Sequence, residues 1–200
     1  VNPGFGKPNE ADGIFCRFQW NDVDFFLLDN RFERTPNNRK TGEKTILGKE
    51  QIQNLIDGLV SSKASFKIVA MGGQFLNPNP LYETYANCAA AERDSILQLI
   101  YAEGIKNVVF VSGDRHHTEM NCLKVAGKPT LYEITSSPLT SGATKIADIE
   151  SNPLRVEGTL VGQRNFTMVK VTGKPKKREL QIETFDSNGK SLWKQSILQE

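Results

Sequence analysis

Residues 108–117 read Val-Val-Phe-Val-Ser-Gly-Asp-Arg-His-His, an apolar run followed directly by the only two histidines of the chain. The run has the length and β-branched composition of a buried strand. Gly113 permits a sharp turn, so the polar residues after it leave the carboxyl end of that strand. Ligands of open α/β sheets bind beside such strand ends, and this segment is therefore the first candidate for a functional site.

Strands and helices are predicted to alternate before this segment. Residues 23–28 and 66–71 are short apolar runs, which predict strands buried on both faces. Apolar residues at helical spacing predict one helix from about residue 47 to 59 and another from about 88 to 103. Residues 15–20 alternate between apolar and polar, which predicts a strand in a hairpin with residues 23–28. This alternation is typical of an α/β sheet with adjacent buried strands.

A different pattern follows residue 120. Residues 130–135 predict a strand, and residues 136–158 predict a long loop with a short helix at 144–150. Alternating segments then predict four strands, at residues 159–161, 166–171, 180–185 and 192–197. Asn188-Gly189 is a strong signal for a hairpin turn. We therefore expect an antiparallel meander in the C-terminal third and a single α/β domain over residues 1–200.

Composition excludes several classes of protein. The chain has 200 residues, 38% of them hydrophobic, which is enough for one globular core. Its formal net charge of +2 gives no electrostatic case for binding nucleic acid or an anionic membrane. No stretch approaches the roughly 20 apolar residues of a membrane helix. Three widely spaced cysteines are not the pattern of a disulfide scaffold.

Polar residues close all three central strands. Asp29 and Gln74 follow the strands at 23–28 and 66–71, as residues 113–117 follow the third. In extended backbone, residues two apart point the same way, so Asp114 and His116 would face one side of the segment. A carboxylate and an imidazole suit Zn, Mn or Fe. The sequence therefore predicts a metal site with Asp114 and His116 as ligands.

Other interpretations of these polar residues at the strand ends stay open. An isolated Asp-x-His is a short motif that occurs by chance, and it fits a mononuclear or purely structural site as well. His117 is expected either to support the site from behind or to lie on the surface. Asp29 could support the site in the same way or form a structural ion pair with Arg31.

Several segments together resemble the PhoD-like alkaline phosphatases and phosphodiesterases, within the calcineurin-like metallophosphoesterases. They occur in the order of the family's motifs and cover nearly the whole chain. They are residues 25–31 (similar to "LDxR"), 46–51 ("LGxxQ"), Glu92-Arg93 ("ER"), 109–116 ("LSGDxH"), 132–139 ("ELTSSP") and 164–166 near the closing strands.

The resemblance implies a fold and an activity. The fold would be a two-sheet αββα sandwich, and the reaction would be metal-dependent hydrolysis of phosphate monoesters or diesters. The metal centre would hold two ions (Fe, Zn, Mn or Ca), with Asp114 and His116 each ligating one. Arg31 would meet the substrate phosphate or brace the site. Family members are often exported, so the resemblance favours an extracytoplasmic location.

The resemblance also implies that the chain is the C-terminal half of such a domain, because the family's other metal ligands come from an N-terminal half. Two ligands cannot hold two metal ions tightly. We therefore expect this chain alone to be inactive, and an exposed sheet edge to invite self-association. The alternative is a non-catalytic module that binds a partner through that edge.

Overall fold

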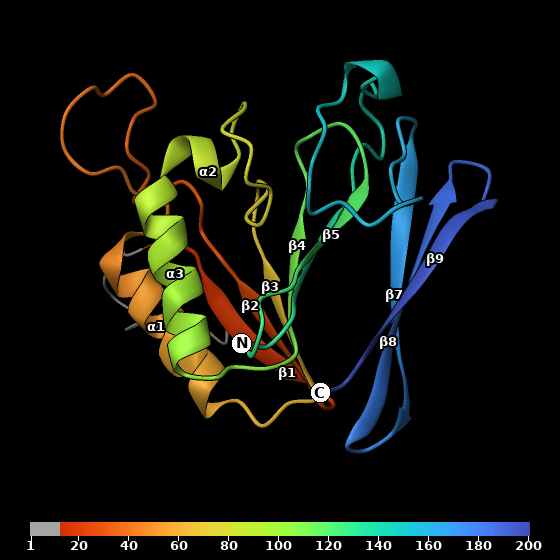
Figure 1. Ribbon diagram of the computed structural model, residues 1–200, viewed down its shortest axis with the longest axis horizontal. Coiled ribbons are helices and arrows are strands. Elements are labelled where there is room, and N and C mark those ends of the chain that lie inside the picture. Colours follow the sequence, from red (N-terminus) through yellow and green to blue (C-terminus); the bar gives the residue numbers. More distant parts are fainter. Residues whose placement is uncertain (1–12) are drawn as a thin grey trace.

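The structure is a computed structural model that describes residues 13–200. A six-stranded sheet lies between a layer of helices and a three-stranded sheet (Figure 1). The larger sheet contains β1 (Cys16–Trp20), β2 (Val23–Leu27), β3 (Phe66–Ala70), β4 (Val108–Ser112), β5 (Glu119–Leu123) and β6 (Leu131–Thr135). The smaller sheet contains β7 (Asn165–Lys174), β8 (Lys177–Asp186) and β9 (Ser191–Leu198). The helices are α1 (Gly48–Ser61), α2 (Tyr85–Cys88), α3 (Ala90–Ala102) and the 3-10 helix η1 (Ile146–Asp148).

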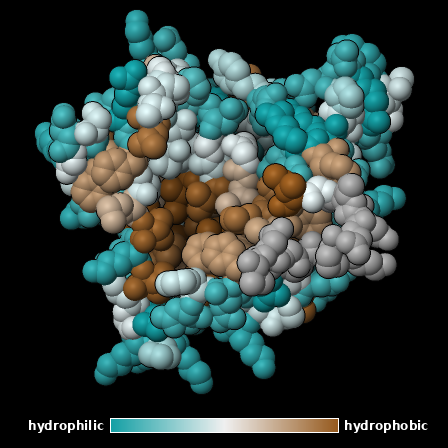
Figure 2. All heavy atoms as spheres, turned by 180° about the vertical axis from the view of Figure 1, so that it is seen from behind, coloured by the Kyte–Doolittle hydropathy of each residue, from teal (hydrophilic) through white to brown (hydrophobic). Residues whose placement is uncertain are grey.

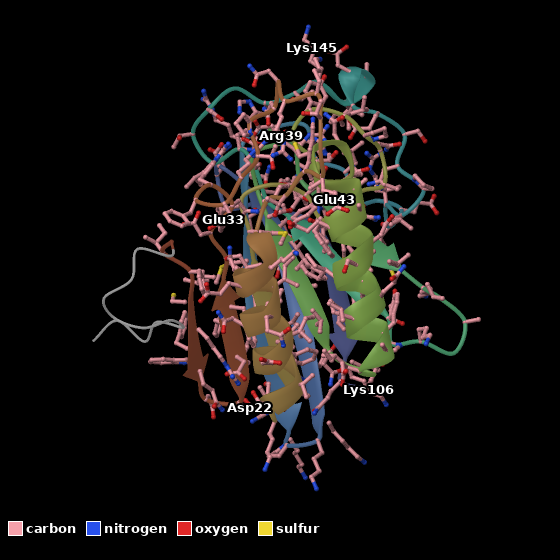
Figure 3. The ribbon with its side chains drawn as sticks, turned by 90° about the vertical axis from the view of Figure 1, so that its left-hand side faces the viewer. Asp22, Glu33, Arg39, Glu43, Lys106 and Lys145 are labelled. Carbon is pink, nitrogen blue, oxygen red and sulfur yellow. The ribbon has the colours of Figure 1, made fainter. Side chains whose placement is uncertain are left out.

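The strand order of the larger sheet brings the candidate residues to one edge. The order is β1-β2-β3-β4-β6-β5, and the four central strands β2, β3, β4 and β6 run parallel. The carboxyl ends of parallel strands meet at the same edge of a sheet. Figure 3 shows Arg39 and Lys145, on loops at this edge, at the opposite end of the molecule from Asp22 and Lys106.

Alternating side chains of the central strands build two cores. Phe26 on β2 and Phe110 on β4 pack with the helices, together with Leu55 of α1. On the other face, Ile68 of β3 packs with Leu180 of β8 and the rest of the smaller sheet. Successive residues of a strand point to opposite faces, so a nearly continuous apolar run can serve both cores.

Glu92 of α3 fixes the start of α1. Its Oε1 accepts the backbone N–H groups of Ile46 and Leu47, both at 2.9 Å, and the Tyr85 hydroxyl at 2.6 Å. Burial, with Glu92 beside it, raises the pKa of Tyr85 well above its usual value. The unpaired amides at a helix start need such acceptors, and a carboxylate there also suits the helix dipole. Glu92 therefore joins the two helices and the loop between them.

Most predicted elements are confirmed, including the α/β class and the C-terminal antiparallel meander. The strand predicted at residues 159–161 is wrong, because only an isolated bridge joins Val161 to Thr118. β5 was not predicted, since its polar residues Glu119 and Asn121 are buried in a hydrogen-bond network that single-sequence patterns do not reveal. The helix predicted from residue 88 begins at Ala90, after the short α2. Within residues 13–200, no helix is long and apolar enough to cross a bilayer.

One prediction about burial is wrong in an informative way. β2 was expected to be buried on both faces. Its helix-facing side chains Asp24 and Phe26 are buried, but on the other face Phe25 is only half-buried and Leu27 is 39% exposed. The smaller sheet therefore covers only part of the larger one.

Candidate metal centre

Hydrogen bonds donated by backbone amides hold the three strand ends together. The Gly72 N–H after β3 donates to Asn30 Oδ1 after β2 at 2.9 Å. The Gly113 N–H after β4 donates to the Gly72 carbonyl at 3.3 Å. Residues from three separate parts of the sequence thus form one surface, as expected from the parallel order of the strands.

Asp114 and His116 both turn outward from the end of β4. Both residues have left-handed backbone, with φ of 67° and 56°, and both are exposed. Arg115, which lies between them, and His117, which follows them, are buried. The segment is therefore not the extended backbone from which the alternation was predicted, although the outward and inward pattern is present. Left-handed conformations of non-glycine residues are uncommon and gather at functional sites.

Arg115 anchors this segment from below. Its Nη1 donates to Gln74 Oε1 at 2.9 Å, and its Nη2 donates to both carboxylate oxygens of Glu150, at 2.8 and 2.9 Å. Its guanidinium also lies over the Tyr82 ring, 4.9 Å from the ring centre. Gln74 was expected to present its amide to the site. The structure buries it completely, so its role is to hold Arg115 in place.

His117 and Glu119 form a second anchor. His117 Nδ1 lies 3.1 Å from the Arg115 carbonyl, and its Nε2 lies 3.7 Å from Glu119 Oε2. Glu119 also accepts hydrogen bonds from Arg155 and from Gln74, the latter at 2.7 Å. Burial alone would raise the pKa of Glu119, but His117 and Arg155 outweigh it and hold the pKa at about 2. A charged network therefore supports the loop that presents Asp114 and His116.

Glu133 lies at the centre of the polar layer beneath the site. Its carboxyl accepts the backbone N–H groups of Phe75 at 2.7 Å and Leu76 at 2.8 Å, and the Ser112 hydroxyl at 2.9 Å. Complete burial nevertheless raises its pKa. Glu133 therefore joins the loop after β3 to the end of β4.

Sequence reasoning did not assign a role to Arg115, Glu119, Glu133 or Glu150. One signal was available for the first two: Arg115, His117 and Glu119 are polar residues at every second position after an apolar strand. Inward-pointing charges at that spacing are rare unless they are paired. Nothing in the sequence indicated that Glu150, far along the chain, supplies the partner.

Asp29 shapes the turn after β2 through the backbone. Its Oδ1 accepts the N–H groups of Arg31 at 2.8 Å and Phe32 at 3.1 Å. Burial opposes ionisation, but these hydrogen bonds lower the pKa of Asp29. The Arg31 guanidinium instead pairs with Glu83, with Nη2 and Oε2 3.2 Å apart, and Arg34 donates to the same oxygen. Asp29 thus organises the backbone that leads to Arg31.

Two cavities meet at Asp114. A cavity of about 110 Å³ is lined by Asp114, Arg31, Gly72 and Glu83 among others. A second, of about 250 Å³, is lined by Asp114, His116, Tyr82 and Glu150 among others. Asp114 therefore lies where a molecule bound in either cavity could reach it.

A comparison with models of known protein families shows which family the chain belongs to. The family model described as PhoD-like phosphatase matches residues 3–188. The chain belongs to the PhoD-like phosphatase family. No match was found among curated proteins.

Two solved structures show the same fold as this PhoD-like chain. The structure of PhoD has a TM-score of 0.69 and 20% sequence identity, and the match covers 98% of this chain and 46% of that one. The purple acid phosphatase PPD1 from yellow lupin has a TM-score of 0.64 and 14% identity, and the match covers 97% and 34%. This PhoD-like chain thus spans less than half the length of either phosphatase.

The residues of this PhoD-like chain fit a metal ion in type but not in number. Asp114 and His116 offer an oxygen and a nitrogen donor, and neither side chain has a hydrogen bond or ion pair within the described residues. Such donors suit Zn, Mn or Fe. Among residues 13–200, however, no three His, Cys, Asp or Glu side chains are placed to hold one ion together. Any further ligands would have to come from outside this part of the chain.

Proposed function

We propose that this chain forms the C-terminal part of the catalytic domain of a metal-dependent phosphatase that hydrolyses phosphate monoesters or diesters. The observation that supports this most is the outward placement of Asp114 and His116 at the carboxyl edge of the sheet. Both side chains are free of protein partners within the described residues, while their neighbours Arg115 and His117 are buried and bonded. Membership of the PhoD-like phosphatase family supports the same reaction.

Asp114 and His116 would each ligate one of two metal ions. Bound metal ions would neutralise charge on a phosphate ester and lower the pKa of a nearby water molecule. The protein's own contribution is to hold the two ligands in place before any ion binds. Arg115 does this through Glu150, and His117 does it through Glu119. These contacts fix the backbone of residues 114–117, so less conformational entropy would be lost when the two side chains bind an ion.

Arg31 would bind the phosphate of the substrate. Its side chain is 71% exposed and lines the same cavity as Asp114. Its present partner Glu83 is shared with Arg34, so Glu83 keeps one cation when Arg31 leaves it. An exposed ion pair contributes about 1 kcal/mol or less, which a substrate phosphate can replace.

The two ligands of this chain alone would bind metal weakly, and the chain alone would have little activity. A dinuclear centre needs more donors than the two present. The domain of residues 1–200 would become active only as part of a longer phosphatase domain.

The proposal is tested by hydrolysis of p-nitrophenyl phosphate and bis-p-nitrophenyl phosphate with added Mn, Zn, Ca or Fe. Residues 1–200 and a chain extended upstream of Val1 are assayed side by side. We expect the extended chain to hydrolyse these substrates and residues 1–200 not to. Equal activity of residues 1–200 would disprove the incomplete centre, and no activity of a folded, metal-loaded extended chain would disprove the phosphatase.

A further inference from the structure

Tyr82 is an exposed aromatic residue beside the two candidate metal ligands. It lines the cavity of about 250 Å³ that also contains Asp114 and His116. The residue is 71% exposed, although tyrosine rings usually cover most of their apolar surface in a folded protein. Single exposed rings also occur at random on protein surfaces, so the way in which this ring is held decides its meaning.

One face of the Tyr82 ring rests on a fixed support. The Arg115 guanidinium lies 4.9 Å from the ring centre, at a distance where a cation attracts the face of an aromatic ring. Hydrogen bonds to Gln74 and to both carboxylate oxygens of Glu150 hold that guanidinium in place. Because Arg115 covers one face and the residue still is 71% exposed, the other face is open to a ligand.

The loop that carries Tyr82 is ordered by its own hydrogen bonds. The Tyr82 carbonyl accepts Asn87 Nδ2 at 2.6 Å, and the hydroxyl of the fully buried Thr84 donates to the Asn79 carbonyl at 2.8 Å. Asn79 Nδ2 in turn donates to the Ser151 carbonyl at 2.9 Å. Tyr82 itself has left-handed backbone, with φ of 49°, a strained conformation that gathers at functional sites. A ring held in this way loses little conformational freedom when a ligand binds.

The two cavities that meet at Asp114 differ in charge. The smaller, of about 110 Å³, contains Arg31 and Arg34, with the Glu83 carboxylate shared between them. Guanidinium groups match the oxygens of a phosphate in charge and geometry. This side of Asp114 therefore suits the phosphate of an ester.

The larger cavity suits an uncharged organic group. Its lining includes the Tyr82 ring, the half-buried Ile149 and the Asp148 carboxylate. Arg115 is the one arginine among the described residues that line it, and Glu150 already pairs with it. A negatively charged group would be repelled there, whereas a flat aromatic group would find a ring to stack on.

We propose that Tyr82 is a specificity-determining residue, which stacks on a planar aromatic or heteroaromatic group of the phosphate ester. That group occupies the cavity beside His116, and the phosphate of the same molecule lies on the Arg31 side of Asp114. The ester is therefore bound in one direction across the site. This inference rests on the proposed function, because it assigns the organic part of the substrate to the same site.

The test is NMR titration of residues 1–200 in EDTA with 4-nitrobenzyl alcohol, an uncharged aromatic probe that needs no metal ion. Saturable shift changes are expected at the amides of Tyr82 and Ile149, with a Kd of roughly 1–10 mM for so small a ligand. Cyclohexylmethanol has a ring of similar size that is not planar, and it should bind at least ~5-fold more weakly.

A second, apolar cavity makes the residue-by-residue readout necessary. A groove of about 630 Å³ between the two sheets is lined by Ile68 and Val169 among others. Figure 2 shows apolar side chains gathered in a hollow in the middle of one face of the molecule. A small aromatic molecule can enter such a groove as well, so shift changes at Ile68 and Val169 are recorded separately from those at Ile149.

Tyr82→Asn removes the ring and keeps a residue that tolerates left-handed backbone, so it should fold. It should weaken binding at Ile149 by ~5-fold or more, and Tyr82→Phe should bind within ~2-fold of the unmodified chain. Trp20→Ala is the matched control. It removes a ring that is 75% exposed and lines the groove between the sheets, so the shifts at Ile149 should not change.

Equal binding of the two alcohols, unchanged binding in Tyr82→Asn, or shift changes confined to Ile68 and Val169 would overturn the proposal. In the hydrolysis assay of the proposed function, phenyl phosphate and cyclohexyl phosphate are compared. Tyr82→Asn should lower the ratio of their kcat/KM values by ~5-fold or more, and an unchanged ratio would also overturn the proposal. Binding at Tyr82 without any hydrolysis would support this aromatic site and count against the phosphatase instead.

Discussion

Arg115 and Glu150 form an ion pair that ties the end of β4 to the loop after η1, with one guanidinium nitrogen 2.8 and 2.9 Å from the two carboxylate oxygens. The Arg115 side chain is only 5% exposed and that of Glu150 only 14%. Burial opposes ionisation of Glu150, yet Arg115 and other hydrogen bonds lower its pKa. The segment that presents Asp114 and His116 is thus held from a distant part of the sequence.

Arg115→Met should destabilise the fold by about 3 kcal/mol, because it leaves the Glu150 carboxylate buried without its cation. Urea unfolding at pH 7 measures this change. Asp94→Asn is the control, since the Asp94 carboxylate that pairs with Arg93 is 60% exposed and should contribute about 0.5 kcal/mol or less. Equal effects of the two substitutions would mean that Arg115 does not anchor the segment.

Asp114→Asn and His116→Asn should leave stability within about 1 kcal/mol, since both residues are exposed and asparagine tolerates left-handed backbone. In the complete phosphatase, each should weaken metal binding measured by titration calorimetry with Mn or Zn. His117→Asn is the opposing variant. It alters a buried side chain and should destabilise the fold by about 2 kcal/mol in urea. A large stability loss in His116→Asn would favour a structural role for that residue.

Glu119 should make the fold sensitive to acid. Its folded pKa of about 2 lies below the ordinary value of 4.5, so the unfolded chain binds the proton first as the pH falls. The stabilisation that ionised Glu119 gives the folded state is complete above about pH 4.5 and is lost between pH 4.5 and about pH 2. The difference between the two pKa values corresponds to about 3 kcal/mol.

Glu119→Gln should therefore be less stable at pH 7 and lose less stability between pH 4.5 and 3, as measured by urea unfolding at each pH. Glu157→Gln, at an exposed position, is the matched control and should follow the unmodified chain. If the stability of Glu119→Gln depended on pH as that of the unmodified chain does, Glu119 would not be the source of the acid sensitivity.

Glu92→Ala should destabilise the fold by about 3 kcal/mol, because it removes the acceptor of two buried amides and of the Tyr85 hydroxyl. Thermal unfolding followed by circular dichroism measures the change. Glu50→Ala, which changes an exposed residue in the first turn of α1, is the control and should change stability by less than about 1 kcal/mol. Similar values for the two would show that Glu92 acts only through its charge near the helix.

Periodicity predicted the elements that depend on local apolar patterns. The three central strands β2, β3 and β4, the helix α1 and the last three strands all have such patterns, and all are present. β5 has none, because Glu119 and Asn121 are buried by hydrogen bonds to residues far along the chain. Residues 159–161 have a pattern that favours a strand but a single bridging partner, so no ladder forms there.

The candidate site was predictable in its location and not in its support. Asp29, Gln74 and Asp114 follow strands, and strand ends meet at one edge, so the place follows from topology. Whether a polar residue at that edge faces outward depends on its partners. Gln74 turns inward because Arg115 and Glu119 bind its side-chain amide. These two partners lie 41 and 45 residues further along the sequence, so no local pattern indicates them.

The inward and outward alternation of residues 114–117 has an evolutionary consequence. Substitutions at Asp114 and His116 are predicted to leave the folded population nearly unchanged, so cellular quality control would not remove them. Substitutions at Arg115 and His117 lower that population and with it the amount of protein. Descendants of this chain could therefore lose catalysis and persist as well-folded pseudoenzymes, identifiable by intact Arg115 and His117 beside altered neighbours.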